Sequence, residues 1–217
     1  MRVSVIIPVK TYSRAKTRLD VPPRVREEIC HVMLREVLRT LAESPLVYET
    51  VLVTREDRAR SLGEEMGATM LRDVEAGVNE AVALADAYLA GKGAAMSLVI
   101  PQDIPLIRDA DIRFLLKFFT PPTCVLVVPS RRLDGTNALL RCPPDIMGTH
   151  YDDDSYRSHM RMARQATPNP ALVHVPRMMR DVDTVEDLGH ILRDDTKPEL
   201  GLCISRLLDS GGVPGAP

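Results

Sequence analysis

Four cations occur within nine residues of the sequence, directly after a short apolar segment. They are Lys10, Arg14, Lys16 and Arg18, and the segment that holds them is named here the basic loop (Lys10–Arg18). A guanidinium group binds phosphate oxygens in pairs and an ammonium group acts as a mobile point charge, so this set suits a polyphosphate. The loop has no glycine, which excludes the Walker A and Rossmann phosphate loops. The sequence predicts a loop that binds phosphate largely through side chains, with a plain solvated basic turn as the alternative.

Two acidic segments could bind a metal ion. Gln102–Pro105 contains Asp103 after an apolar run, and Arg180–Asp183 contains Asp181 and Asp183. Carboxylate oxygens are suitable ligands for Mg²⁺ beside phosphate. Two carboxylates and a cationic loop are what phosphoryl transfer needs, because the metal neutralises phosphate oxygens and the cations stabilise the leaving group. The plainer alternatives are a turn at Asp103 and a helix cap at Asp183.

These distant segments need a scaffold that brings them together, and the hydrophobic pattern predicts one. Val3–Val9 is a nearly continuous apolar run, as expected for a strand buried on both faces of a parallel sheet. Strands and helices then alternate, which predicts a mostly parallel α/β sheet with helices on both faces. Ligands of such sheets bind outside the carboxyl ends of the strands. That rule selects the basic loop, the segment Glu75–Asn79, and Gln102–Pro105.

The remaining elements follow from the same periodicities. The expected strands after the first are Thr50–Thr54, Ala68–Leu71, Met96–Ile100, Cys124–Pro129, Ala138–Arg141 (paired with the preceding strand or at the sheet edge) and Leu172–Val175. The expected helices are Pro23 to Ser44, Asp57–Met66, Asn79–Leu89, Asp111–Phe119, Asp154–Ala166 and Asp183–Arg193. The spacing of Asp183 and Glu186 matches a capping box. Gly135–Asn137 could be a hairpin turn.

Composition limits the class of protein. A formal net charge of -2 argues against a general nucleic-acid binder. No apolar run approaches the roughly 18 residues of a membrane helix, and the first one has no cleavage pattern of a signal peptide. The four cysteines lack metal-site spacing and are expected to be reduced, and the five histidines are expected to be structural or at the surface. We expect a cytoplasmic chain with a single domain over residues 1–208 and a flexible tail at 209–217.

Six strings of the sequence resemble one family of nucleotidyltransferases. They are P-V-K-x-x-x-R-A-K-T-R-L (Pro8–Leu19), G-V-N-E-A-V (Gly77–Val82), Q-D-I-P (Gln102–Pro105), G-T-N-A-L (Gly135–Leu139), D-S-Y-R-x-H (Asp154–His159) and D-V-D-T-V-E-D-L (Asp181–Leu188). From residue 3 to about 193 the chain is similar to the 2-phospho-L-lactate guanylyltransferases of coenzyme F-420 biosynthesis. The last string also occurs in molybdenum-cofactor nucleotidyltransferases. The resemblance implies a three-layer α/β/α, glycosyltransferase-A-like fold with a mostly parallel, twisted sheet.

The resemblance also implies a role for each matched residue. Asp103 and Asp183 would be ligands of one or two Mg²⁺ ions, and Lys16 and Arg18 would contact the triphosphate of GTP. Further contacts are expected on the nucleotide side from Lys10, Gly77 and Asn79, and on the acceptor side from Thr136, Asn137 and Ser155. One position departs from the family, because Asp152 stands where a glycine would approach the anionic acceptor. A carboxylate there would repel the acceptor unless it turned away.

The implied reaction moves GMP from GTP onto 2-phospho-L-lactate, giving lactyl-2-diphospho-5′-guanosine and pyrophosphate. No general base is expected, because the attacking phosphate oxygen is already anionic near neutral pH. The alternatives are a phosphoenolpyruvate or 3-phosphoglycerate guanylyltransferase, a molybdopterin nucleotidyltransferase, or a non-catalytic nucleotide-binding domain. The resemblance further implies a homodimer that hands its product to a lactyl transferase, with no nucleic-acid or membrane partner.

Overall fold

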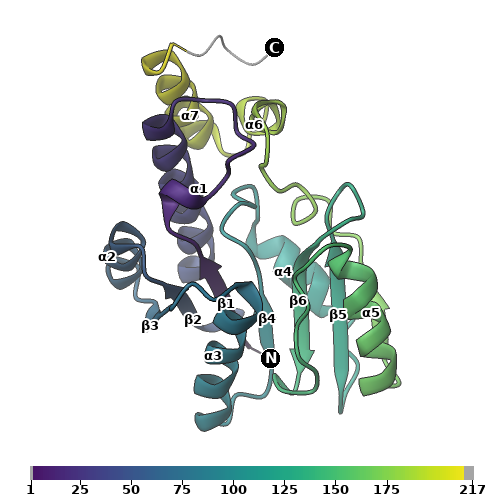
Figure 1. Cartoon of the computed structure of the whole chain (residues 1–217). Coiled ribbons are helices and arrows are strands. Elements are labelled where there is room, and N and C mark those ends of the chain that lie inside the picture. The colour runs from purple at the N-terminus through teal and green to yellow at the C-terminus, as the bar shows by residue number, and fades with distance from the viewer. Residues whose placement is uncertain (1, 213–217) are drawn as a thin grey trace.

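A computed structural model describes residues 2–212 of the chain, and its elements form three layers around one sheet (Figure 1). The sheet has seven strands in the order β3-β2-β1-β4-β6-β5-β7. The strands are β1 (Val3–Val9), β2 (Val47–Thr54), β3 (Thr69–Arg72), β4 (Ser97–Val99), β5 (Cys124–Pro129), β6 (Thr136–Cys142) and β7 (Pro170–Leu172). The helices are α1 (Pro23–Glu43), α2 (Asp57–Glu65), α3 (Val78–Gly91), α4 (Asp109–Leu116), α5 (Ser155–Ala166), α6 (Val185–Leu192) and α7 (Pro198–Ser210), with a 3-10 turn at Tyr12–Arg14.

The sheet is mostly parallel, which confirms the predicted fold class. β1 pairs in parallel with β2 and β4, β2 with β3, and β5 with β7. β6 runs antiparallel to both of its neighbours, β4 and β5, and so lies inside the sheet. The chain moves outward from β1 to β3 and then returns to β4 on the other side of β1. The ends of β1 and β4 therefore meet where the strand order reverses, the place where sheets of this kind bind ligands.

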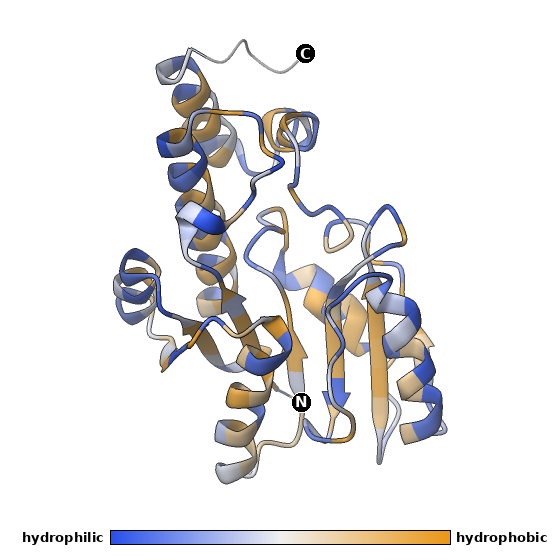
Figure 2. Cartoon of the chain, viewed as in Figure 1, coloured by the Kyte–Doolittle hydropathy of each residue, from blue (hydrophilic) through white to orange (hydrophobic). Residues whose placement is uncertain are grey.

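β1 is apolar along its length because it faces two cores. Val5, Ile7 and Val9 belong to the core beneath α1, α2 and α4, whereas Ile6 belongs to the core beneath α3 and α5. Alternate side chains of a strand point to opposite faces, so burial on both faces requires a continuous apolar run. Figure 2 shows the result, with hydrophobic strands in the centre and hydrophilic residues on the outer sides of the helices.

α7 is an element that the sequence did not predict. Its residues Leu200, Ile204 and Leu208 are buried against the core that α1 and α6 share. Residues 209 and 210 belong to this helix and not to the tail expected from 209 onward, while 213–217 of that tail lie outside the described residues. A second difference is in β7, where Pro170–Leu172 pairs with β5 although Leu172–Val175 was expected.

The cap of α6 also differs from the prediction, by one residue. The Asp187 carboxylate accepts hydrogen bonds from the backbone N–H of Thr184 at 2.9 Å and of Asp183 at 3.1 Å. The capping pair is thus Thr184 and Asp187, and the predicted pair of Asp183 and Glu186 is wrong. As a result the Asp183 side chain is not used as a cap and can take part in other contacts.

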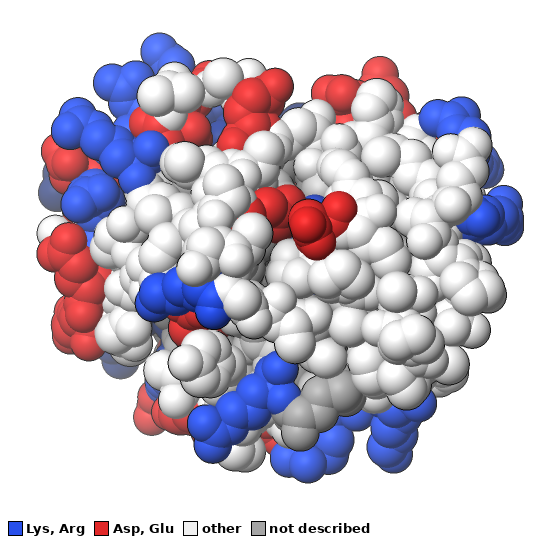
Figure 3. Space-filling model, turned by 90° about the horizontal axis from the view of Figure 1, so that it is seen from below, with Lys and Arg blue, Asp and Glu red and all other residues white. Residues whose placement is uncertain are grey.

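The two ends of the sheet differ in what they carry. Figure 3 looks at the end seen from below, where uncharged residues fill most of the centre and charged side chains lie mostly around the rim. The acidic and basic residues selected from the sequence follow the carboxyl ends of β1 and β4, at the opposite end. No helix in residues 2–212 is both long and apolar enough to cross a bilayer.

Candidate active site

Three adjoining cavities form a groove along the edge where β1 and β4 end. The first, about 220 Å³, shares Lys10 and Arg14 with the second, about 420 Å³. The second shares Asp103, Thr136 and Asp183 with the third, about 530 Å³. The first cavity is named here the basic end of the groove for Lys10 and Arg14, although Asp73 and Glu75 also line it, and the third cavity is named the acidic end. The structure therefore brings the basic loop, Gln102–Pro105 and the segment before α6 to one place.

Lys16 lies at the centre of this groove between two carboxylates. Its Nζ is 2.6 Å from Asp183 Oδ1 and also pairs with Asp103 Oδ2. The side chain is 10% exposed, so burial disfavours its charge, yet the charges of Asp103 and then Asp183 outweigh burial and raise the pKa of Lys16. Its backbone has a φ of 52°, a left-handed conformation that costs energy for a residue with a Cβ and is typical of functional sites.

Asp103 and Asp183 suit a magnesium ion. Both converge on the Lys16 ammonium, and the second oxygen of Asp103, Oδ1, is buried without a hydrogen-bond partner among the described residues. Within residues 2–212 no group of three or more His, Cys, Asp or Glu is placed to hold a metal ion. Mg²⁺ is commonly held by one or two carboxylates that substrate phosphates and water complete, and these two residues fit that pattern.

Asp181 is a third carboxylate next to the first two. Burial, and then the charge of Asp103, raise the pKa of Asp181. Asn137 donates from Nδ2 to Asp181 Oδ1 and to the carbonyl of Met178, both at 3.0 Å. Asn137, a residue expected on the acceptor side, uses its amide nitrogen to hold the segment that leads into Asp183.

The arginines of the basic loop remain accessible. The Arg14 and Arg18 side chains are 72% and 73% exposed. Arg14 pairs with Glu75 at 3.0 Å, and Arg18 lies 3.7 Å from Asp183. Exposed guanidinium groups beside a groove can turn onto a phosphate with little change elsewhere.

Two backbone amides of the basic loop are already in use. Thr11 N donates to Glu75 Oε1 at 3.1 Å, and Tyr12 N donates to Glu56 Oε2 at 3.0 Å. Tyr12 itself is buried and fixes this turn to the core. These amides cannot cradle a phosphate, which supports the prediction that side chains make the contacts.

The start of α3 borders the basic end of the groove. Gly77 precedes the helix with a φ of 142°, and a Cβ added there would lie 2.6 Å from Glu80 Oε2, so the position requires glycine. Asn79, a residue expected on the nucleotide side, accepts with its Oδ1 from Tyr151 N at 2.8 Å. Asn79 thus connects α3 to the segment before α5, across the groove.

Thr136 and Ser155, the two hydroxyl residues expected on the acceptor side, lie side by side at the acidic end. Ser155 Oγ donates to Thr136 Oγ1 at 3.2 Å, and His159 Nδ1 lies 2.9 Å from the same Thr136 oxygen. His159 is fully buried, which agrees with the structural role expected from the sequence, and its contact with Thr136 also connects it to the groove. The signal that could have identified it is its place at the end of the D-S-Y-R-x-H string.

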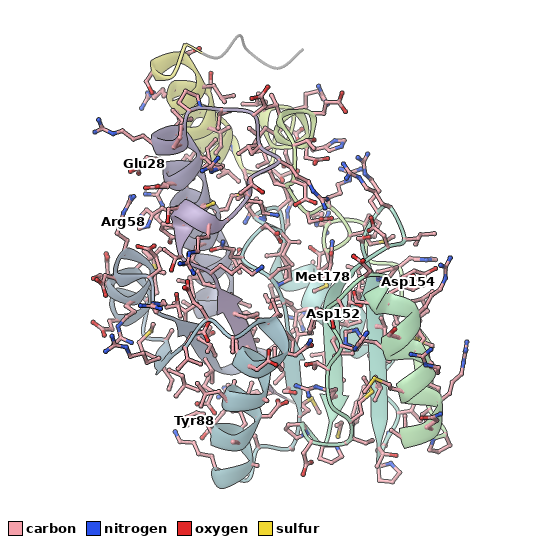
Figure 4. All side chains as sticks on the ribbon, viewed as in Figure 1. Glu28, Arg58, Tyr88, Asp152, Asp154 and Met178 are labelled. Carbon is pink, nitrogen blue, oxygen red and sulfur yellow. The ribbon has the colours of Figure 1, made fainter. Side chains whose placement is uncertain are left out.

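The acidic end is lined by many carboxylates. They are Asp103, Asp134, Asp152, Asp153, Asp154, Asp181 and Asp183, with Arg18 as a neighbouring cation. The Asp152 side chain is exposed, and its Oδ2 lies 3.6 Å from His150 Nδ1. Figure 4 places Asp152 and Asp154 near the start of α5, close to the end of the sheet where the groove runs. An anionic acceptor here needs donors or cations to offset these charges.

Comparison with known proteins gives one family. Residues 3–198 match the family described as "Guanylyl transferase CofC like". The chain is 34% identical to a phosphoenolpyruvate guanylyltransferase of Conexibacter woesei, over 87% of this chain and 86% of that one. It is 29% identical to a 3-phospho-D-glycerate guanylyltransferase of Colwellia psychrerythraea, over 87% of this chain and 90% of that one. It is 28% identical to a 2-phospho-L-lactate guanylyltransferase of Methanobrevibacter smithii, over 86% of this chain and 82% of that one. A cytidylyltransferase of Leptospira borgpetersenii shares the fold, with a TM-score of 0.63 at 14% identity over 97% of this chain and 93% of that one.

Proposed function

The chain belongs to the CofC-like guanylyl transferase family, and on this premise we propose that it moves GMP from GTP onto a three-carbon acid that carries a phosphate on C2. The observation that carries the proposal is the arrangement of the groove. Cations that suit a triphosphate lie at one end, and a pair of hydroxyl groups that suits a small anion lies at the other. The cluster of Lys16, Asp103 and Asp183 lies between them, where the two phosphates would meet.

The reaction needs positioning more than proton transfer. A phosphate oxygen of the acceptor attacks the α-phosphorus of GTP, the bond from that phosphorus to the bridging oxygen breaks, and pyrophosphate leaves with the electron pair. Lys10, Arg14 and Arg18 would bind the triphosphate, while the hydroxyls of Thr136 and Ser155 would bind the acceptor. Two reactants held in line react as if at high concentration, which supplies much of the rate.

Charge neutralisation at the centre of the groove supplies the remaining part of the rate acceleration. Lys16 keeps its proton, so it can offset negative charge that develops on the phosphates in the transition state. Asp103 and Asp183 would hold Mg²⁺, which neutralises phosphate oxygens when bound.

Two acceptors fit the proposal. 2-Phospho-L-lactate is the acceptor implied by the motifs, and relatives at 28% and 29% identity carry that name. Relatives at 34%, 32% and 31% identity are named for phosphoenolpyruvate, which favours phosphoenolpyruvate as the second candidate. Both molecules place a carboxylate on C1 and a phosphate on C2, so the same donors can serve either.

A panel of substrates tests the proposal. The purified chain is incubated with GTP, ATP or CTP and with 2-phospho-L-lactate, phosphoenolpyruvate or 3-phospho-D-glycerate, while pyrophosphate release and product mass are measured. We expect release with GTP and one of the two C2-phosphorylated acids. Release with 3-phospho-D-glycerate alone, or with none of the acids, would contradict the proposal.

Several finer properties remain predictions. We expect activity to disappear when EDTA removes Mg²⁺ and to return when Mg²⁺ is restored. We also expect a cytoplasmic homodimer that passes its reactive diphosphate diester to a lactyl transferase. Sedimentation of the purified chain tests the homodimer, and co-purification with the lactyl transferase tests the handover of the product.

A further inference from the structure

We propose that His159 is a positioning residue for the acceptor. It fixes the direction of the hydrogen bonds through Thr136 and Ser155, so that one hydroxyl hydrogen of this pair is left to donate to an anionic group of the acceptor. The inference rests on the proposed function, since it deepens how the acidic end of the groove binds a phosphorylated acid.

The backbone fixes which nitrogen of His159 carries the proton. His150 N lies 2.9 Å from His159 Nε2, and a backbone N–H can only donate, so Nε2 accepts. The ring is neutral, because burial and then the charge of Arg141 lower the pKa of His159 to about 4. A neutral imidazole has one N–H, which must therefore be on Nδ1. Nδ1 accordingly donates to Thr136 Oγ1, 2.9 Å away.

Counting the hydroxyl hydrogens of Thr136 and Ser155 shows that one of them is not used in a hydrogen bond within the pair. Thr136 Oγ1 accepts from His159, so neither hydroxyl hydrogen is spent on the ring. Thr136 and Ser155 share one hydrogen bond of 3.2 Å, which uses one of their two hydrogens. With Ser155 as the donor, both lone pairs of Thr136 Oγ1 are filled and its own hydrogen is left over. In residues 2–212 this hydrogen has no protein acceptor.

The free hydrogen is placed where an acceptor would lie. Thr136 lines both the second and the third cavity, beside Asp103 and Asp183. Ionised carboxylates accept hydrogen bonds and cannot donate them, so the seven aspartates of the acidic end can only repel an anion. A neutral hydroxyl whose hydrogen is forced outward is a donor that adds no charge of its own.

The same network holds His159 in its place. The Tyr151 ring meets the His159 ring edge to face, with centroids 4.8 Å apart, and Tyr151 N is bonded to Asn79. Tyr151 follows His150, whose N–H sets the tautomer. The segment before α5 thus orients the ring, and the ring orients the hydroxyl pair.

The His159 ring makes two hydrogen bonds, one with Thr136 and one with His150 N. Variants that keep only one of these bonds distinguish a positioning role from a structural role. His159→Gln places an acceptor near the Nε2 position and loses the donor to Thr136, whereas His159→Asn retains a donor near the Nδ1 position. We expect His159→Gln to raise the KM for the acceptor about tenfold or more, with the KM for GTP within about twofold of wild type. We expect a smaller rise for His159→Asn, and a melting temperature is recorded for each variant.

Substitutions of Thr136 complete the test. Thr136→Val removes the hydroxyl and should raise the acceptor KM as much as His159→Gln, while Thr136→Ser should restore it. The double variant that combines Thr136→Val with His159→Gln should be no worse than Thr136→Val alone, because both substitutions act through one hydrogen. Multiplied effects in the double variant, or parallel rises of both KM values in His159→Gln, would show a merely structural histidine and overturn the inference.

A measurement that does not need turnover separates this inference from the proposed function. Long-range ¹H–¹⁵N spectra of the labelled wild-type protein at pH 7 report the tautomer of each histidine. A proton on Nδ1 of His159 supports the inference, and a proton on Nε2 or on both nitrogens overturns it. Absence of turnover with every phospho-acid counts against the proposed function alone.

Discussion

Charge is concentrated on three residues at the centre of the groove. Lys16 forms ion pairs with both Asp103 and Asp183 and offsets one of their two charges, and its raised pKa keeps it protonated. The rule that ligands bind at strand ends selected Lys16 and Asp103 from the sequence, whereas Asp183 was selected as part of an acidic pair after a distant strand and by the resemblance. The ion pairs could not be read from the sequence, since Lys16 and Asp183 lie 167 residues apart and only packing brings them into contact.

Asp103→Asn is the first prediction at this scale. The amide has the size of the carboxylate but lacks its charge, so the fold should be retained while kcat falls by about 100-fold or more. Pyrophosphate release and thermal melting measure the two effects. Asp57→Asn, at an exposed position of α2, is the matched control and should keep wild-type activity. Near-wild-type turnover of Asp103→Asn would contradict the role given to this carboxylate.

Arg18→Ala tests the basic loop. Because the Arg18 guanidinium is exposed beside the groove, its loss should cost little stability and raise the KM for GTP by about tenfold, with a much smaller effect on the acceptor KM. Arg24→Ala removes another exposed arginine, outside the groove, and should change neither constant. A larger rise in the acceptor KM would instead assign Arg18 to the acidic end.

At the scale of elements, the helices and strands determine where the side chains of the groove lie. Most strands and helices were predictable because their apolar residues repeat with the period of one structure. α7 was missed although its buried Leu200, Ile204 and Leu208 recur at helical spacing, because Gly201 weakens the helix propensity of this segment and a Gly/Pro-rich stretch follows it. The tautomer of His159 was unpredictable for another reason, because it depends on a backbone N–H nine residues away in a segment without regular structure.

Asp187→Ala tests how α6 positions the site. Asp187 accepts from the N–H groups of Thr184 and Asp183, so its loss should lower the free energy of unfolding by about 1–2 kcal/mol and reduce kcat through Asp183. Denaturant unfolding and steady-state kinetics measure these changes. Glu186→Ala, at the exposed neighbouring position, is the control. Equal losses in both variants would show that the cap does not matter to the site.

At the scale of the whole molecule, α7 connects a helix of the N-terminal half to the last part of the chain. It packs against α1 and α6, and Figure 1 shows these helices together above the sheet. α6 begins just after Asp183 and its capping residue Thr184, so the packing of α7 supports the same edge of the sheet that carries the groove.

Ile204→Ala should therefore destabilise the fold without changing the chemistry. Ile204 is fully buried, and its truncation should lower the free energy of unfolding by about 2–5 kcal/mol. Leu202→Ala, on the same helix at 59% exposure, should change it by less than about 0.5 kcal/mol. Urea unfolding measures both, with kcat at 25 °C as a check on the site. Similar values for the two variants would contradict this account of α7.

The groove also has a consequence for the encounter with GTP. The basic loop brings Lys10, Arg14, Lys16 and Arg18 to the groove, where Asp73 and Glu75 also line the basic end, whereas the acidic end carries seven aspartates and one cation, Arg18. The field of the groove is therefore most negative at the acidic end. Such a field acts over about 8–10 Å at physiological ionic strength, before any contact forms. We therefore expect a polyphosphate to approach the basic loop more readily than the acidic end, and we expect added salt to weaken that preference.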